Sequence, residues 1–278
     1  MIKLIATDLD GTLFYPKRKL KLLTKKNRKF MKDFVNDGNE IALVSGRNYF
    51  VSKRIEKRIK NKIDMIGCNG SVVYHSGELL FDSPMNHQDV YDFYLKNRNN
   101  KNILTWIFMS DKNNMIVVHN SLSTLLRVIY RIVLFFQFGY NGKYKIGRKK
   151  FEKMVNDDNA KIYKIMAIYG LGKKATEKAR LASLEVSKET EGKFEVMWSK
   201  ESIELMNSGV NKAKSLEKLI DNIGIKKEEV AVIGDSGNDV PLFETFPNSF
   251  VMSHAHQEVK KKAKVEIDGV YCLKDYIK

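Results

Sequence analysis

The sequence predicts an α/β protein in which a doubly wound parallel sheet carries an inserted α+β domain. Short, nearly continuous apolar runs near both ends of the chain are typical of strands buried on both faces of a parallel sheet. Each run ends in a loop of small or acidic residues, and amphipathic helix patterns separate the runs. The middle of the chain has a different order of strands and helices, which predicts the second domain.

The strands of the predicted core are followed by helices with recognisable ends. An apolar stripe from Phe30 to Val35 predicts a helix that Thr24 caps and Gly38 stops. A second stripe, Leu216–Ile223, ends at Gly224. The predicted core strands are Ile2–Thr7, Glu40–Val44 and Val230–Ile233.

The inserted domain follows a predicted hairpin of Val72–Tyr74 and Leu79–Phe81. We predict domains at 1–83 with 208–278 (core) and at 84–207 (insertion), with Trp106 and Trp198 as packing residues of the insertion. The predicted elements of the insertion are strands at Ile103–Met109, Met115–His119, Ile162–Tyr169, Phe194–Trp198 and Ser202–Met206, and helices at Ser121–Phe138 and Lys173–Lys188.

Composition narrows the classes of function. The 278 residues are 43% hydrophobic, enough for a sizeable core, and the net charge is +16. The lysines and arginines are spread over the chain without the aromatic pattern of a nucleic-acid module, so we expect solvated helix faces and no nucleic-acid partner. The sequence leaves the oligomeric state open.

The expected location is the cytoplasm. Cys68 and Cys272 are the only cysteines and have neither disulfide-scaffold nor zinc spacing, which fits a reducing compartment. The apolar start Ile2–Ala6 runs directly into acidic residues, unlike a signal peptide. Leu122–Phe138 is the most apolar later segment, but it contains two arginines, so we expect no membrane partner.

The first candidate catalytic residues directly follow the first predicted strand. Asp8 and Asp10 are two residues apart, so an extended chain can turn both toward one site, and Gly11 permits a sharp turn. A carboxylate can attack phosphorus and form an aspartyl phosphate. Because that attack brings two anions together, it requires a divalent cation such as Mg²⁺, which prefers oxygen ligands.

The other candidates follow later strands or begin a helix. Asp235 is expected as a further metal ligand, and Asp239 is expected either to hold a metal-bound water or to orient Lys212. Lys212 brings positive charge to a helix start that Asn211 caps. Ser45 offers a hydroxyl, and the next backbone amide can bind a phosphate oxygen.

Each motif has an ordinary explanation when taken alone. A calcium loop starting at Asp8 would need glycine at Leu13 and glutamate at Lys19, so that alternative fails. Ser45-Gly46-Arg47, a single lysine, or the loop after the third core strand could each be turn or surface chemistry. Their order along the chain, at strand ends, favours a common site.

Taken together, these motifs resemble the haloacid-dehalogenase superfamily, and the long insertion resembles its Cof-like phosphatases. The resemblance covers essentially the whole chain. The residues that carry it are Asp8-Leu9-Asp10-Gly11-Thr12-Leu13, Ser45-Gly46-Arg47, Lys212, Gly234-Asp235-Ser236-Gly237-Asn238-Asp239, and Asn69-Gly70-Ser71.

The resemblance implies a Rossmann-like core that carries the site and a cap that selects a small phosphorylated metabolite. It implies Asp8 as nucleophile, Asp10 as general acid and base, and Mg²⁺ held by Asp8, the Asp10 carbonyl and Asp235. Asp239 and Arg47 have supporting roles. The residues implied to contact the phosphoryl group are Leu9 (through its backbone), Ser45, Gly46, Lys212 and Asn238. His254 stands near a position where asparagine is frequent, and whether it touches the site is left open.

Three functions remain open on the sequence. The first is a Mg²⁺-dependent phosphatase for sugar or cofactor phosphates, and the second is a phosphotransferase or mutase with an acceptor other than water. The third is a sensor that accepts phosphate on aspartate as a signal, against which the acid–base position Asp10 argues. The sequence does not identify the physiological substrate.

Overall fold

The computed structural model describes residues 1–16, 23–113, 115–120 and 144–277. The chain forms two compact units: a core unit, Met1–Asp82 with Val210–Lys278, and an inserted unit, Ser83–Gly209. The predicted helix at Ser121–Phe138 lies outside the described residues. No helix in the described ranges is long and apolar enough to cross a lipid bilayer.

The core unit is built on an eight-stranded sheet, which confirms the α/β fold class. The strand order is β14-β13-β12-β1-β2-β3-β4-β5, parallel from β14 to β3 and antiparallel for the last two strands. The first strand is shorter than predicted and starts at Leu4. The strands are β1 Leu4–Thr7, β2 Glu40–Val44, β3 Asp64–Gly67, β4 Val72–His75, β5 Glu78–Asp82, β12 Val230–Gly234, β13 Asn248–Met252 and β14 Val265–Ile267.

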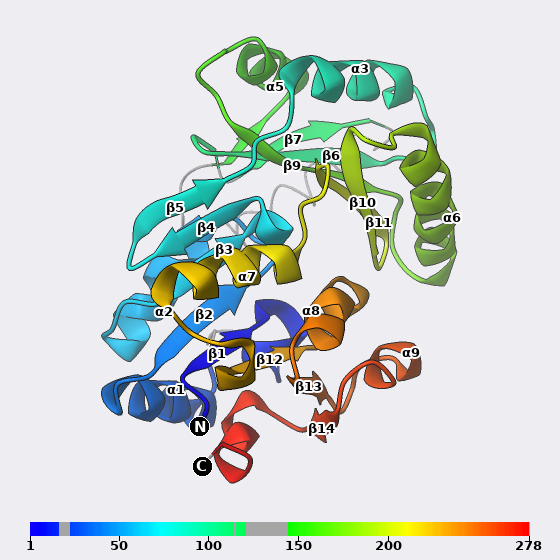
Figure 1. Cartoon of the computed structure of the whole chain (residues 1–278). Coiled ribbons are helices and arrows are strands. Elements are labelled where there is room, and N and C mark those ends of the chain that lie inside the picture. The colour runs from blue at the N-terminus through cyan, green and yellow to red at the C-terminus, as the bar shows by residue number, and fades with distance from the viewer. Residues whose placement is uncertain (17–22, 114, 121–143, 278) are drawn as a thin grey trace. The chain divides into compact units, whose positions relative to one another are not determined.

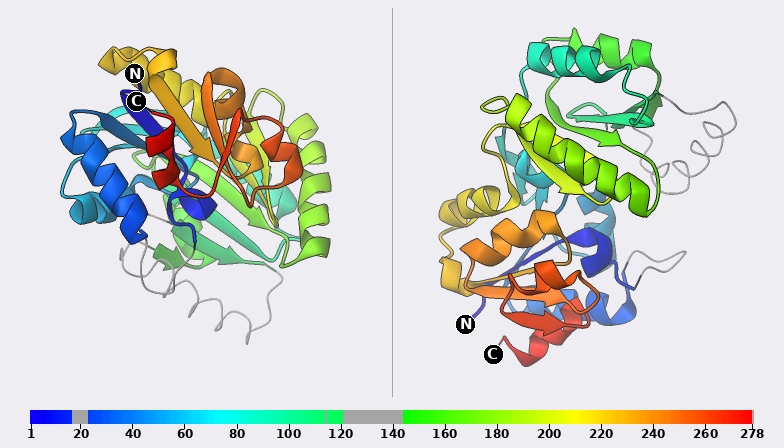
Figure 2. Two further views of the ribbon diagram at one scale, coloured as in Figure 1. Left: turned by 90° about the horizontal axis from the view of Figure 1, so that it is seen from below. Right: turned by 90° about the vertical axis from the view of Figure 1, so that its right-hand side faces the viewer.

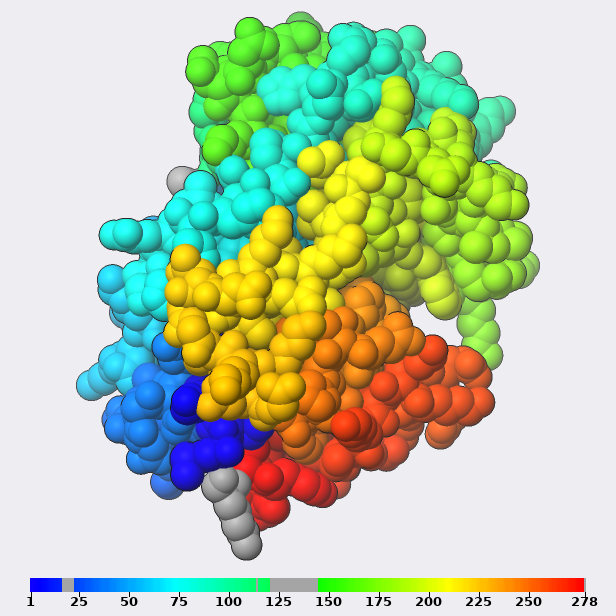
Figure 3. Space-filling model, in the orientation of Figure 1, coloured from blue at the N-terminus to red at the C-terminus, as the bar shows by residue number. Residues whose placement is uncertain are grey.

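Helices cover both faces of this sheet (Figure 1). α1 and α2 pack on one face with the C-terminal 3₁₀ segment, and α7, α8 and α9 pack on the other, as the left-hand view of Figure 2 shows. The outer surface of α7 is seen in Figure 3. The helices are α1 Lys25–Asn36, α2 Ser52–Ile59, α7 Lys212–Ile223, α8 Val240–Thr245 and α9 Gln257–Lys260, with 3₁₀ segments at Tyr49–Val51, Cys68–Gly70, Lys227–Glu229, Gly237–Asp239 and Val270–Asp275.

Local signals set the ends of the two predicted core helices. The Thr24 hydroxyl accepts the backbone N–H of Asn27 at 3.1 Å and caps α1. The Asn211 side chain accepts the N–H of Lys214 at 2.9 Å and caps α7. Gly224 ends α7 with a φ of 72°, a conformation that favours glycine. These capping predictions are confirmed, and the second one fixes where Lys212 begins its helix.

The inserted unit is a six-stranded sheet of order β10-β11-β9-β6-β7-β8, with only β7 and β8 parallel. Three helices pack on one of its faces, as the right-hand view of Figure 2 shows, over a core that includes Trp106 and Phe151. The described elements are β6 Thr105–Ser110, β7 Met115–His119, β8 Tyr144–Ile146, β9 Ile162–Ile168, β10 Phe194–Ser199, β11 Ser202–Asn207, α3 His87–Asn97, α5 Arg148–Val155 and α6 Lys173–Glu189.

One packing prediction for this unit is wrong. Trp106 is fully buried, but Trp198 is 42% exposed. Trp198 lies near the end of β10, an edge strand of the sheet, and its indole N–H donates to the Lys200 carbonyl at 2.6 Å. An edge position leaves one side of a strand without a neighbour, which explains the exposure.

Candidate active site

The site is built at the carboxyl ends of three adjacent strands of the core unit. β1 pairs in parallel with β12 and with β2, so the loops that follow these strands emerge side by side. Asp8 follows β1, Ser45 follows β2, and Asp235 follows β12. The Asp8 backbone N–H donates to the Ile233 carbonyl at 2.9 Å, which extends the sheet pairing to the start of the loop. Asp8 is 5% exposed.

A tight turn after Asp8 brings Asp235 close. Gly11 has a φ of 89°, and a Cβ atom at this position would lie 2.2 Å from Oδ2 of Asp235. Only glycine therefore allows this approach without a displacement. The Thr12 hydroxyl donates to Oδ1 of Asp235 at 3.2 Å. We did not predict this contact from the sequence, although Thr12 directly follows the Asp-x-Asp-Gly run.

Lys212 supplies a buried cation from the start of α7. Its side chain is fully buried, and Nζ lies 2.8 Å from Oδ1 of Asp8 and 2.6 Å from Oδ1 of Asp239. A third, longer bond of 3.4 Å reaches Oδ1 of Asn238. Charged hydrogen bonds in a buried site are strong and geometrically restrictive, so this ammonium fixes two carboxylates relative to each other.

Asp239 also holds the loop that carries Asp235. Its Oδ2 accepts the backbone N–H groups of Asp235 at 3.0 Å and Ser236 at 3.1 Å, while Oδ1 binds Lys212. Asp239 is fully buried. Because both of its oxygens are engaged, the residue serves to support the loop and the lysine.

Burial and like charge act on the ionisation of Asp8. Burial is the main cause that raises the pKa of Asp8, and the charges of Asp239 and Asp235 raise it further against the opposing effect of Lys212. For Lys212, burial alone would lower the pKa, but the charges of Asp239 and Asp8 outweigh it and raise the pKa. Lys212 therefore stays protonated, whereas ionised Asp8 needs more positive charge than this lysine supplies.

The acidic cluster fits a divalent cation. Oxygens of Asp8, Asp235 and Asp239 all lie within 4.8 Å of one another. Three carboxylates and one ammonium leave two negative charges, which one dication would balance. Oxygen donors are the ligands that Mg²⁺ prefers. Because Asp239 is engaged by Lys212 and two amides, Asp8 and Asp235 are the better candidates to hold the ion.

Asp10 is placed differently from Asp8. Its carboxylate forms a two-point ion pair with Arg47, with Nε–Oδ2 at 2.5 Å and Nη2–Oδ1 at 2.7 Å, and its side chain is 56% exposed. For Arg47, burial lowers the pKa, but the hydrogen bonds and charge of Asp10 outweigh it and raise the pKa. The guanidinium also lies 5.8 Å from the Phe14 ring centre.

The remaining predicted residues line the same strand ends. Ser45 is 2% exposed, and its hydroxyl accepts the N–H of Arg47 at 3.2 Å across the partly exposed Gly46. Leu9 is fully buried in the apolar core. The Asn238 side chain accepts from the Ser236 hydroxyl at 2.8 Å and donates to Asn69 at 3.4 Å.

His254 reaches the acidic cluster, a point that the sequence left open. Its Nε2 lies 3.7 Å from Oδ2 of Asp235, and its ring stacks on Tyr15 with ring centres 3.9 Å apart. The one sequence feature that could have indicated this contact is the position of His254, two residues after Met252, the last residue of β13.

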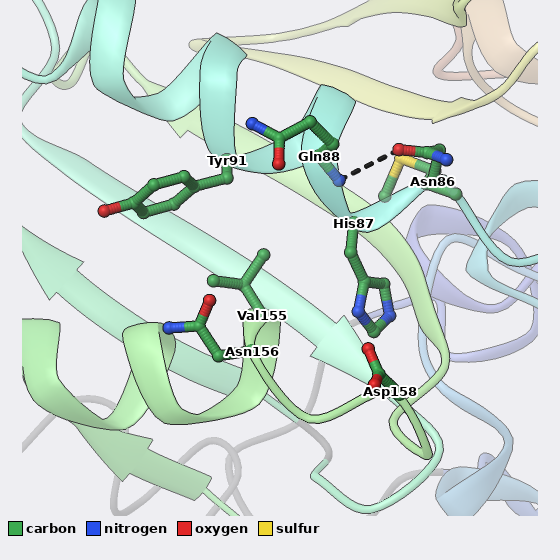
Figure 4. Close-up of a pocket in the computed structure, with 8 residues that line it drawn as sticks. Asn86, His87, Gln88, Tyr91, Val155, Asn156 and Asp158 are labelled. Carbon is green, nitrogen blue, oxygen red and sulfur yellow. Dashed lines mark hydrogen bonds between the residues drawn. The ribbon is translucent and has the colours of Figure 1, made fainter.

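A pocket in the inserted unit contains none of the predicted site residues. It has a volume of about 590 Å³ and lies between the start of α3 and the end of α5 (Figure 4). Asn86, which caps α3 by accepting the N–H of Gln88 at 2.9 Å, is one of its polar groups. The lining residues are Met85, Asn86, His87, Gln88, Tyr91, Val155, Asn156 and Asp158.

Comparison with known proteins identifies relatives along nearly the full length. The model of the haloacid dehalogenase-like hydrolase family matches residues 5–270. A 5-amino-6-(5-phospho-D-ribitylamino)uracil phosphatase of Bacillus subtilis, YwtE, is 26% identical over 282 residues, covering 94% of this chain and 91% of the relative. A phosphoglycolate phosphatase of Thermoplasma volcanium is 26% identical over 261 residues, covering 94% and 89%. A haloacid dehalogenase-like hydrolase structure from B. subtilis superposes with a TM-score of 0.79 at 21% identity, covering 100% of both chains.

Proposed function

The chain belongs to the haloacid dehalogenase-like hydrolases, and on this premise we propose that it is a Mg²⁺-dependent phosphatase of small phosphate esters. The observation that carries the proposal is the buried Asp8 carboxylate, held at the end of β1 by Lys212 and next to Asp235. Relatives named as phosphatases over nearly the whole chain support the same reaction class.

Asp8 is the proposed nucleophile. An oxygen of its carboxylate forms a bond to phosphorus while the bond from phosphorus to the ester oxygen breaks, and the electron pair leaves with that oxygen. Water then attacks the phosphorus of the aspartyl phosphate, which releases phosphate and restores the carboxylate. The ion pair with Lys212 supports this role because it favours the anionic form that attacks.

Recognition of the phosphoryl group falls to donors around Asp8. The Lys212 ammonium balances negative charge on the group, and the Asn238 amide, the Ser45 hydroxyl and the backbones of Leu9 and Gly46 orient its oxygens. The proposed Mg²⁺ ligands are Asp8, Asp235 and the Asp10 carbonyl. When bound, the ion neutralises the charge of nucleophile and phosphate.

Asp10 is the proposed general acid and base. It protonates the leaving oxygen in the first step and accepts a proton from water in the second. Arg47 holds the Asp10 carboxylate in an ion pair, so we propose that Asp10 turns from Arg47 toward the reacting group during turnover. Arg47 is then a positioning residue.

The substrate class and location complete the proposal. Residues 84–207 are proposed to act as the cap that selects among phosphorylated metabolites, such as sugar or cofactor phosphates. The sequence has only two cysteines, Cys68 and Cys272, without disulfide-scaffold spacing, which supports the proposal of a reducing, cytoplasmic location.

The proposal is tested with p-nitrophenyl phosphate and the Asp10→Asn variant. Wild-type protein should turn over steadily with Mg²⁺ and stop in excess chelator. Because nitrophenol leaves without an acid, Asp10→Asn should be phosphorylated but should release phosphate about 10²–10⁴-fold more slowly. Rapid quench should give a burst of nitrophenol and a mass increase on the peptide that contains Asp8. Full wild-type activity in chelator, or a variant that loses phosphorylation together with turnover, would contradict these roles.

A further inference from the structure

A second group of ionisable side chains lies at the amino ends of strands in the core unit. Glu40 begins β2, Asp64 begins β3, and His75 ends β4. β2 and β3 pair with Ala42 opposite Asp64, and β3 runs antiparallel to β4. This register places one donor atom from each of the three side chains within 4.8 Å of the others. We call these three residues the amino-end cluster.

Asp64 has an oxygen that nothing in the described chain satisfies. The residue is 4% exposed, and its Oδ1 accepts the N–H of Ser76 at 3.0 Å and lies 3.0 Å from Nδ1 of His75. Its Oδ2 is buried and has no hydrogen-bond partner among the described residues. An unpaired buried carboxylate oxygen is costly, so this atom points to a ligand that the protein chain does not supply.

The charge of the amino-end cluster is not balanced by a lysine or arginine. In the described parts of the chain, neither Glu40 nor Asp64 forms an ion pair with a lysine or arginine. Lys62 is near, but its ammonium donates to the Ser76 carbonyl at 2.9 Å. Burial raises the pKa of Glu40, and the charge of Asp64 raises it further, while His75 lowers it. Glu40 and Asp64 therefore bring up to two negative charges to one place, and each raises the cost of ionising the other.

We propose that Glu40, Asp64 and His75 form a binding site for a transition-metal dication, and that this ion is Zn²⁺. One imidazole nitrogen and two carboxylate oxygens are a donor set that suits zinc, whereas Mg²⁺ favours oxygen alone. Zinc bonds of about 2.0–2.2 Å place tetrahedral donors about 3.3–3.6 Å apart, and donor atoms of the three side chains lie within 4.8 Å of one another, so small side-chain movements would bring them to that spacing. His75 is 35% exposed and leaves the ion a path from solvent.

The site is separate from the proposed catalytic centre. Glu40 begins β2, and Ser45 follows the other end of the same five-residue strand, which spans roughly 15 Å. Zinc at the amino-end cluster would join the starts of β2 and β3 to the end of β4. The Ser76 N–H already orients Asp64 through Oδ1, which leaves Oδ2 to the metal.

The test measures zinc binding by the whole protein with Mg²⁺ in excess. Purified protein is stripped of metal and dialysed against Zn²⁺, and bound zinc is measured by mass spectrometry. Wild-type protein should bind one zinc per chain. His75→Gln and Glu40→Gln should each lower the zinc affinity by at least about 10-fold, since even residues that only support metal ligands change affinity by 10–100-fold. His256→Gln, at an exposed histidine, is the matched control and should leave the affinity unchanged.

A second readout covers variants that fold poorly. Zinc should slow amide hydrogen exchange in β4 and at Ser76 of the wild type, and it should not do so in either variant. Zinc that is retained by His75→Gln but lost by Asp235→Asn lies at the catalytic end and would overturn the proposal. A wild-type protein that binds no zinc would overturn it as well. Neither measurement depends on phosphatase activity.

Discussion

The core sheet has an acidic cluster at each end, and the two differ in how their charge is held. At the carboxyl end, the fully buried Lys212 binds Asp8 and Asp239 directly. At the amino end, the imidazole of His75 lies 3.0 Å from Oδ1 of Asp64, and within the described chain neither Glu40 nor Asp64 forms an ion pair with a lysine or arginine. The first cluster contains a lysine ammonium, and the second contains the imidazole of His75 in the corresponding place.

The two clusters illustrate two ways in which a protein can keep carboxylates buried. A lysine within the fold balances part of the charge at any physiological pH, so the catalytic end stays organised and needs only a dication to complete its balance. The amino-end cluster must take up protons or a metal ion. Removal of the Lys212 charge is therefore expected to destabilise the carboxyl end of the sheet, whereas removal of the Glu40 charge is expected to stabilise the amino end.

The largest expected effect is on activity at the catalytic end. Asp8→Asn removes the proposed nucleophile but keeps the shape of the side chain, so phosphate release from p-nitrophenyl phosphate should fall by at least about 10⁴-fold. Asp33→Asn makes the same chemical change on exposed α1, where Asp33 pairs with Lys29, and should stay within twofold of wild type. Asp8→Asn activity within tenfold of wild type would remove Asp8 from the mechanism.

The next effect is on stability. Lys212→Met leaves Asp8 and Asp239 buried without their cation, so the core unit should lose about 3–5 kcal/mol of unfolding free energy. Amide hydrogen exchange of β1 and β12 measures this loss. Lys227→Met, which breaks an exposed pair with Glu217, should cost at most about 1 kcal/mol. Both tryptophans belong to the inserted unit, so their fluorescence follows that unit separately. Equal losses in the two variants would contradict a special role for the buried pair.

The smallest effect has the opposite sign. Glu40 has a folded-state pKa above its ordinary 4.5, so metal-free wild-type protein should lose stability as the pH rises above that value. Glu40→Gln lacks this charge and should be more stable than wild type at pH 7 by about 0.2–1 kcal/mol, the cost of like charges on paired strands. The difference should vanish below about pH 4.5, as chemical unfolding at several pH values will measure. A variant that is less stable at pH 7 would mean that His75 already compensates Glu40.

The sequence was informative where a signal is local. β2 and β7 have the predicted bounds because each is an apolar run with clear ends. The caps of α1 and α7 follow from Thr24 and Asn211. By contrast, β3 was not predicted, since a four-residue strand that begins with Asp64 resembles a loop.

The candidate site, like the fold, could be predicted from the sequence only where the signals are local. Strand ends and a helix start could be identified, and the structure brings Asp8, Lys212 and Asp235 together there. The ion pair of Asp10 with Arg47 and the approach of His254 to Asp235 depend on loop conformations that no spacing rule encodes. The amino-end cluster needs the register of three strands, so its members could not be grouped from sequence alone.

The separation of Asp8 and Lys212 along the chain has a consequence for synthesis. The two residues are 204 positions apart, and β12, which flanks β1, also comes from the segment that starts at Val210. A nascent chain stalled before Val210 therefore has β1 paired only with β2 and an aspartate without its ammonium. The ribosome must therefore synthesise the C-terminal segment before the proposed nucleophile, Asp8, can bind Lys212. An incomplete chain should show no activity, as phosphate release from a chain that ends at Gly209 would test.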